Sequence, residues 1–148
     1  MTLFAASLGQ YLYGPPVSGR ITTLFGVKDE LPPNGHSGVD IAAYSGAEVT
    51  APAAGLVCDV FALPLRGNEW DEFKRVFGNS VILDHGDFYT LYAHLRDAPG
   101  VSEGLDVLPG ATLGIVGSTG QSTGPHLHWG MALHDNRYFN FPADKGPR

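Results

Sequence analysis

Glycine and proline interrupt this chain along its whole length, and this constrains the possible fold more than any other feature. Of the 148 residues, 20 are glycine and 11 are proline. Both residue types favour turns, and no long stretch keeps the 3.6-residue apolar period of an amphipathic helix. We therefore predict an all-β fold of short strands joined by turns. The length suits one domain with a sizeable core.

The predicted domain occupies residues 17–148, after an irregular lead-in at 1–16 that ends in "YGPP". One segment, "RGNEWDEFKRVFG" (66–78), departs from the strand texture. Asn68 can cap a helix there, acids occupy the first turn, and aromatic residues recur at helical spacing. We predict one short helix in an insert that packs onto the body of the domain through Trp70, Phe73 and Phe77.

Charge and composition exclude several classes of function. Fifteen acidic against nine basic residues leave a net charge of −6, which would repel a nucleic acid backbone. The single cysteine, Cys58, lies in an apolar run, cannot form an internal disulfide and is expected in the core. "MTLFAASL" lacks the features of a secretory signal, and no run approaches the roughly 20 apolar residues of a membrane span. We expect a monomer.

The stretch "STGPHLHWGMALH" (122–134) sets two histidines one residue apart in a predicted strand. Residues i and i+2 of a strand lie on one face about 6.6 Å apart, so His126 and His128 point the same way. The alternate residues are all apolar and predict the core face: Leu127, Trp129, Met131 and Leu133. The histidine face, which continues through Gly130, Ala132 and His134, is then the one that can meet solvent or a ligand.

A third histidine lies on a predicted hairpin, "NSVILDHGDFYTLYAHL" (79–95). In its second strand, alternation predicts an apolar face made of Tyr89, Leu91, Ala93 and Leu95. His94 then lies on the opposite, non-core face with Thr90 and Tyr92. His85, at the hairpin tip, is expected to serve the turn or contact solvent.

"GHSGVDIA" supplies a further histidine and a carboxylate, His36 and Asp40. In a fully extended chain their Cα atoms would lie about 13 Å apart, so we expect Gly38 to bend the backbone. If both converge with His126 or His128, two imidazoles and one carboxylate surround an open fourth position, as in catalytic zinc sites. Such an ion lowers the pKa of water, which predicts hydrolysis.

A hydrolase also needs a group that moves protons, and the glutamate of an H-E-x-x-H motif is absent from the sequence. The candidates are His94 and whichever histidine of the H-x-H pair does not bind metal. An imidazole titrates near neutrality, so it can take a proton from the attacking water or, as imidazolium, stabilise an oxyanion.

Three strings together resemble the lysostaphin-type, LytM-like zinc endopeptidases of metallopeptidase family 23, which cut peptide bonds in bacterial peptidoglycan. They are "GHSGVDIAAYSGAEVTAPAAGLV", "GNSVILDHGDFYTLYAHL" and "GIVGSTGQSTGPHLHW". The resemblance implies one zinc ion held by His36, Asp40 and His128, with His94 and His126 as catalytic histidines. It also implies a compact antiparallel β-sandwich or barrel-sandwich hybrid with an open groove over the metal. The expected location is extracellular, periplasmic or at the cell wall, or that of a phage lysin.

The chain departs from the family pattern in three places. One is the segment from about Leu63 to Phe77, which is longer than a simple hairpin connection. Lysostaphin-like members carry a tyrosine shortly before the first ligand, and "FGVKDELPPNG" has none; Tyr92 or Tyr44 is a candidate substitute. Gly130 stands where an acidic residue is common.

Two other functions compete with the peptidase. One is a catalytically silent module that binds the wall or activates another hydrolase, but such proteins typically lose ligands and this chain keeps them. The other is a sugar-transport phosphocarrier with two nearby histidines, a chemistry that needs no metal carboxylate and leaves Asp40 unexplained.

Overall fold

The computed structural model describes residues 14–28, 35–64 and 71–133. Most of the predicted lead-in 1–16 and the chain from His134 onward lie outside these ranges. The described elements, in chain order, are β1 (Arg20–Thr23), β2 (Gly38–Ala42), β3 (Glu48–Thr50), β4 (Gly55–Phe61), α2 (Asp71–Phe77), β5 (Asn79–Asp84), β6 (Phe88–Leu95), β7 (Asp106–Val107), β8 (Thr112–Ile115) and β9 (His126–Leu133).

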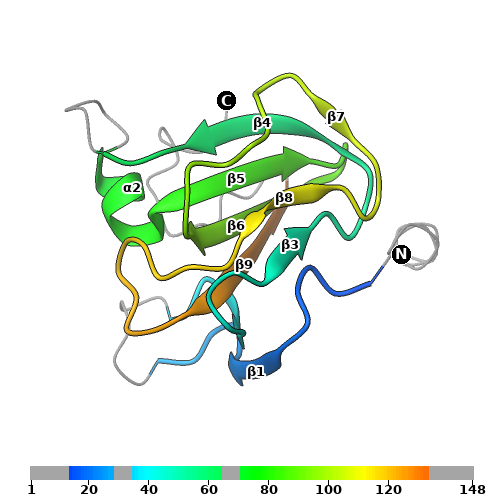
Figure 1. Cartoon of the computed structure of the whole chain (residues 1–148). Coiled ribbons are helices and arrows are strands. Elements are labelled where there is room, and N and C mark those ends of the chain that lie inside the picture. Colours follow the sequence, from blue (N-terminus) through cyan, green and yellow to red (C-terminus); the bar gives the residue numbers. More distant parts are fainter. Residues whose placement is uncertain (1–13, 29–34, 65–70, 134–148) are drawn as a thin grey trace, which may run out of the picture.

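The described strands form two antiparallel sheets, and α2 is the one helix within the described ranges, which confirms the predicted all-β fold (Figure 1). The larger sheet has the order β1-β2-β9-β6-β5-β4-β7, and β3 pairs with β8 in the smaller one. The predicted hairpin at 79–95 is present as β5 and β6. Because β9 lies between β2 and β6, the order brings three segments that are distant in the sequence side by side.

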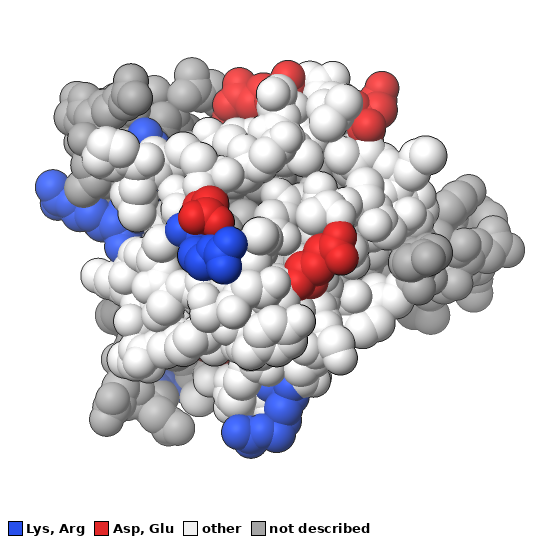
Figure 2. Space-filling view, in the orientation of Figure 1, with Lys and Arg blue, Asp and Glu red and all other residues white. Residues whose placement is uncertain are grey.

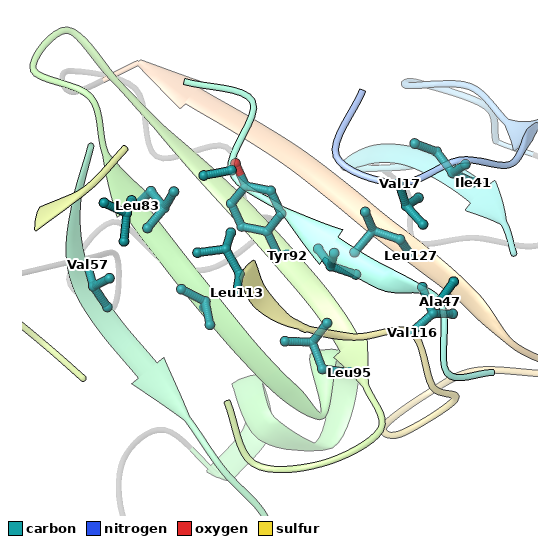
Figure 3. Packing of buried hydrophobic residues seen from close by; sticks show 14 residues of the cluster. Val17, Ile41, Ala47, Val57, Leu83, Tyr92, Leu95, Leu113, Val116 and Leu127 are labelled. Carbon is teal, nitrogen blue, oxygen red and sulfur yellow. The ribbon is translucent and has the colours of Figure 1, made fainter. Parts of the chain in front are cut away.

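The main hydrophobic core lies between the two sheets (Figure 3). The large sheet contributes Val57, Leu83, Tyr92 and Leu127, and the small sheet contributes Val49 and Leu113. All six side chains are 0–1% exposed. Burial of this apolar surface is the main term that stabilises the fold.

A second apolar cluster covers the other face of the large sheet, where α2 packs. Its buried members are Phe61, Phe73, Phe77, Ile82, Leu91, Ala93 and Ala132. The Phe73 ring lies 4.4 Å from that of Phe61 and 4.7 Å from that of Phe77, centroid to centroid. The prediction that the insert packs onto the body is confirmed for Phe73 and Phe77, whereas Asn68 and Trp70 lie outside the described residues.

The second cluster overturns part of the face assignment for β9. Met131 and Leu133, predicted for the core, are 43% and 44% exposed. Gly130 and Ala132, predicted on an open face, are buried. The side chains of β9 still alternate between the two faces of the sheet. On one face, however, the main core ends before Met131, and on the other face α2 and its neighbours cover Ala132. The expectation of one apolar and one open face therefore fails.

The face assignment for β6 was wrong at Tyr92 because both faces of the sheet are covered, and at His94 because the strand contains a bulge. Tyr92, predicted on the non-core face, is fully buried in the main core together with Leu95. The register runs from Val81↔Tyr92 to Asn79↔Leu95, so β6 carries one residue more than β5 over this span. This β-bulge contains His94, whose φ of 62° is in the left-handed region. Strict alternation ends there.

The charged side chains on the described surface do not gather in one place. On the face drawn in Figure 2, Lys and Arg side chains are scattered and are separated by wide uncharged areas. Among the described residues, no helix combines the length and apolar character needed to cross a membrane.

Candidate metal and catalytic site

Two of the predicted metal ligands are direct neighbours on paired strands. In the β2–β9 ladder Asp40 lies opposite His128, and Ala42 lies opposite His126. Side chains on directly opposed residues point to the same face of a sheet. Strand pairing therefore brings together two residues that are 88 positions apart in the sequence.

His36 lies just before β2 and is held by two backbone hydrogen bonds. Its backbone N–H donates to the Val27 carbonyl, and its carbonyl accepts from the Gly26 N–H, both at 2.8 Å. Gly35, at φ 79°, supplies the change of direction. The expected bend at Gly38 is wrong: Gly38 lies inside β2, and its missing side chain makes room for the neighbouring strand. A Cβ there would lie 2.5 Å from the Trp129 carbonyl oxygen and 2.9 Å from Nε2 of His128.

Three potential ligand atoms converge on one point. Nε2 of His36 lies 3.0 Å from Oδ1 of Asp40 and 3.1 Å from Nδ1 of His128, and the last two atoms are 2.9 Å apart. Bonds of 2.0–2.1 Å in a tetrahedral zinc site put ligand atoms about 3.3 Å apart. Among the described residues, this trio forms a group able to hold a metal ion.

Hydrogen bonds on the outer side of each imidazole orient the two ligand nitrogens. A carbonyl can only accept, so Nδ1 of His36, 3.1 Å from the Leu24 carbonyl oxygen, carries its proton and leaves a lone pair on Nε2. Nε2 of His128 lies 3.3 Å from the Ser37 hydroxyl, which can accept from it and leave Nδ1 free to bind. Such outer contacts set the tautomer of metal-binding histidines.

The three residues of the trio are largely buried, and they shift one another's pKa values. His36 and His128 are 7% and 4% exposed. Burial acts to raise the pKa of Asp40, but hydrogen bonds to His128 and His36 outweigh it and hold that pKa well below its usual range. Burial lowers the pKa of His128, whereas the hydrogen bond and charge of Asp40 outweigh burial at His36 and raise its pKa. The carboxylate is therefore ionised at neutral pH and available to a cation.

The two remaining histidines lie beside this trio. The His94 ring is 4.7 Å from the His126 ring and 5.9 Å from the His128 ring, centroid to centroid. Nε2 of His126 is 3.6 Å from Oδ1 of Asp40. The structure thus brings all five predicted site residues together, although His94 arrives through the bulge and not through plain alternation.

Both of these histidines donate Nδ1–H to a backbone carbonyl. The acceptor for His94 is Thr119, at 2.7 Å, and that for His126 is Gly124, at 2.8 Å. A neutral ring then keeps its lone pair on Nε2. Burial, followed by the charge of His126, lowers the pKa of His94 to about 4. His94 is therefore neutral at pH 7 and able to accept a proton.

Several contacts at the site had no clear signal in the sequence. The ring of Phe77, at the end of α2, lies 5.3 Å from the His128 ring, and Ser37 contacts the same histidine. Helical spacing predicted that Phe77 is buried, but not against which residue. Tyr92 is excluded as a substitute for the family tyrosine because it is fully buried in the main core, and Tyr44 is 74% exposed in the loop after β2.

His85 lies in the β5–β6 turn, as expected, and both its ring nitrogens contact protein groups. Nδ1 donates to the Ala54 carbonyl at 2.7 Å, and Nε2 lies 2.8 Å from the Thr90 hydroxyl. Thr90 is in turn 2.9 Å from the Tyr92 hydroxyl. This histidine therefore ties the hairpin to the 51–54 loop and to a buried tyrosine. His134 lies outside the described residues.

Comparisons with known proteins found both similar sequences and similar structures. The model of peptidase family M23 matches residues 34–141. The chain is 42% identical over 95 residues to the DD-carboxypeptidase/endopeptidase Mpg of Neisseria meningitidis, which covers 64% of this chain and 19% of that protein. It is 35% identical over 129 residues to the murein hydrolase activator NlpD of Escherichia coli, with 83% and 30% covered.

A solved structure of a zinc-containing peptidase from Vibrio cholerae matches with a TM-score of 0.69 at 28% identity. The match covers 85% of this chain and 38% of that one. The chain thus spans about a fifth to a third of the length of the curated relatives named above.

Proposed function

Since the chain belongs to peptidase family M23, we propose that it is a zinc-dependent endopeptidase that hydrolyses peptide bonds of bacterial peptidoglycan. The observation that carries the proposal is the convergence of Nε2 of His36, Oδ1 of Asp40 and Nδ1 of His128 within 3.1 Å of one another. Two further imidazoles, His94 and His126, lie beside them.

The chemistry of this trio fits a zinc ion. With Nδ1 of His36 protonated, its Nε2 directs a lone pair at the Asp40 carboxylate, and Nδ1 of His128 does the same when its proton is on Nε2. Three electron-rich atoms so close together repel unless a cation or a proton lies between them. Two imidazoles and one carboxylate are the ligand types of catalytic zinc sites, which keep a fourth position open.

A zinc ion bound by these residues would act as a Lewis acid toward water and toward the carbonyl of the bond to be cut. The proton transfers fall to His94 and His126. Each is oriented through Nδ1 by a carbonyl and presents Nε2, which can accept a proton from the attacking water and then, as imidazolium, stabilise the oxyanion or protonate the leaving amine.

Peptidoglycan is the proposed substrate because two relatives from Vibrio cholerae, each 32% identical to this chain, are named peptidoglycan DD-endopeptidases. Peptidoglycan lies outside the cytoplasm, so we place the proposed activity in the periplasm, at the cell wall or outside the cell. A phage lysin would act on the same polymer.

A direct assay tests this function. Purified chain is loaded with one equivalent of zinc and mixed with isolated sacculi, and soluble muropeptides are identified by mass spectrometry. We expect release that a chelator abolishes and zinc restores, and the fragments identify the bond that is cut. His94→Ala and His126→Ala should abolish release while the protein still binds zinc. His85→Gln, a histidine variant away from the site, should retain release.

The second candidate is an activator of another cell-wall hydrolase, favoured by the 35% identity to NlpD. It predicts that the chain binds sacculi without releasing muropeptides, with or without zinc, and increases release by a separate murein hydrolase. The presence of all five site residues supports the peptidase.

A further inference from the structure

His94 has a backbone conformation that needs support. It is the one non-glycine residue with a positive φ, 62°, among those that the structure describes. For an L-residue this conformation costs free energy, and it persists only where surrounding contacts hold it. Such strain is often found at functional sites.

The strain has a direct consequence for the side chain. Leu95 and Tyr92 face the main core, and Ala93 belongs to the opposite cluster. If residue 94 were extended, alternation would direct its ring toward the core side, away from His126. The extra residue and the left-handed φ turn the His94 ring to the site face, 4.7 Å from His126.

Asn79, on the neighbouring strand, holds the chain that follows His94. Its side chain is buried, donates from Nδ2 to the carbonyls of Leu95 (3.2 Å) and Arg96 (3.3 Å), and accepts at Oδ1 from the Leu63 N–H (2.8 Å). These bonds help to fix the two carbonyls that follow the strained residue.

Thr119 contacts both His94 and the residues that hold the backbone after it. Its hydroxyl donates to the Leu95 carbonyl at 2.7 Å and accepts from the Asn79 N–H at 3.1 Å. Its own carbonyl accepts from Nδ1 of His94 at 2.7 Å. One residue therefore contacts the backbone after His94 and the imidazole itself.

The loop that carries Thr119 is fixed in turn by α2. The Gln121 N–H donates to the Val76 carbonyl at 2.9 Å. Gly78 and Gly120 pack so closely that a Cβ on Gly78 would lie 2.3 Å from Oγ1 of Thr119. The insert that contains α2 thus fixes the place of the residue that orients His94.

We propose that Asn79 and Thr119 are positioning residues, which keep His94 in its strained conformation with Nε2 directed at the reacting centre. Their importance for catalysis rests on the proposed function, whereas their effect on the His94 ring does not. The effect on the His94 ring can be measured without substrate.

The sharpest test compares Thr119→Val with Thr119→Ser in the zinc-loaded chain. Valine has nearly the shape of threonine but removes both hydroxyl hydrogen bonds, whereas serine retains them. We expect Thr119→Val to lower kcat about 100-fold with KM and zinc content unchanged, the scale expected for a misplacement of about 1 Å. Thr119→Ser should stay close to wild type. Asn79→Asp, which keeps the acceptor for Leu63 but removes the amide donor, is the second variant if Thr119→Val does not fold.

NMR of chain labelled with ¹⁵N-histidine gives the readout that is independent of activity. In the wild type, His94 should show a hydrogen-bonded Nδ1 proton, assigned by its absence in His94→Gln. That signal should vanish or shift in Thr119→Val and persist in Thr119→Ser. Val81→Ala is the control: it changes a buried side chain on β5, the strand of Asn79, and keeps the hydrogen bonds of Thr119 and Asn79. It should lower stability and leave the His94 signal intact.

The outcomes separate the two proposals. An unchanged His94 signal in Thr119→Val and Asn79→Asp overturns the positioning role, whatever the activity. If the His94 signal is altered but kcat is unchanged, the positioning role does not matter for catalysis. If His94→Gln itself retains wild-type kcat, the proposed role of His94 in catalysis fails, while the signal still reports on the hydrogen bond to Thr119.

Discussion

Asp40 and His128 are direct partners across the β2–β9 ladder, and Nδ1 of His128 lies 2.9 Å from Oδ1 of Asp40. The metal site therefore depends on strand register, because a slip of one residue would turn His128 to the opposite face. His36 completes the trio from the turn before β2.

Replacing Asp40 tests the metal site with the smallest change of shape. Asp40→Asn removes the negative charge and keeps the size, so the fold should persist while zinc affinity falls about 100-fold or more. Competition with a chromophoric chelator measures the affinity, and circular dichroism checks the fold. Undiminished zinc binding by this variant would rule out Asp40 as a ligand.

The Gly38→Ala variant tests the close approach of β2 and β9. The new Cβ would lie 2.5 Å from the Trp129 carbonyl oxygen and 2.9 Å from Nε2 of His128, and neither the ladder nor the ring can move without disturbing the site. We expect lower stability by about 1–3 kcal/mol and weaker zinc binding. Gly100→Ala is the matched control, since its Cβ would meet nothing within 4 Å. Equal zinc affinity for the two variants would contradict this reading of Gly38.

Much of the fold and the site could be predicted from local patterns. Turn residues and alternation predicted the strands, and helical spacing predicted that Phe73 and Phe77 pack onto the body. The pairing of His36 with Asp40 in one short string, and the resemblance of three strings to a family, named five residues that the structure brings together.

The errors arose where a side chain's environment depends on distant parts of the chain. Alternation along β6 failed at His94 because a bulge is set by the register with β5, which local composition does not encode. Met131 and Ala132 were assigned to the wrong environments because the sequence does not say where α2 covers the sheet. The predicted bend at Gly38 is wrong because a glycine needed for close strand approach looks the same in sequence as one needed for a turn.

The pH dependence of stability should include a contribution from His85. Burial lowers the pKa of His85 in the folded chain, so the folded state favours the neutral ring. This contribution is fully present above the unfolded pKa of about 6.5 and is lost as the pH falls through the lower folded pKa. We expect His85→Gln to be less stable than wild type by about 1–2 kcal/mol at pH 7.5, with a smaller difference at pH 5.

Urea denaturation of both proteins with a chelator present measures this contribution without zinc. The chelator removes the separate pH dependence of metal binding. A difference that stays constant or grows as the pH falls would contradict a neutral, half-buried His85.

Ser37 should tune zinc affinity without taking part in catalysis. Its hydroxyl lies 3.3 Å from Nε2 of His128, the nitrogen that does not face the proposed ion. Ser37→Ala removes this partner and should weaken zinc binding about 10-fold, with little loss of kcat once the site is saturated. A chelator titration and an assay at saturating zinc separate the two effects.

Phe77 and Phe73 offer a matched pair that tests whether α2 supports the metal site beyond its role in the core. Both rings are buried in the second cluster, but the Phe77 ring also lies 5.3 Å from the His128 ring. Phe77→Leu and Phe73→Leu should each lower stability by about 1–2 kcal/mol, since each leaves a small cavity. Only Phe77→Leu frees the His128 ring on one side, so it alone should weaken zinc binding, by several fold. Chelator competition at a temperature where both variants are fully folded makes the comparison, and equal zinc affinities would assign Phe77 to the core alone.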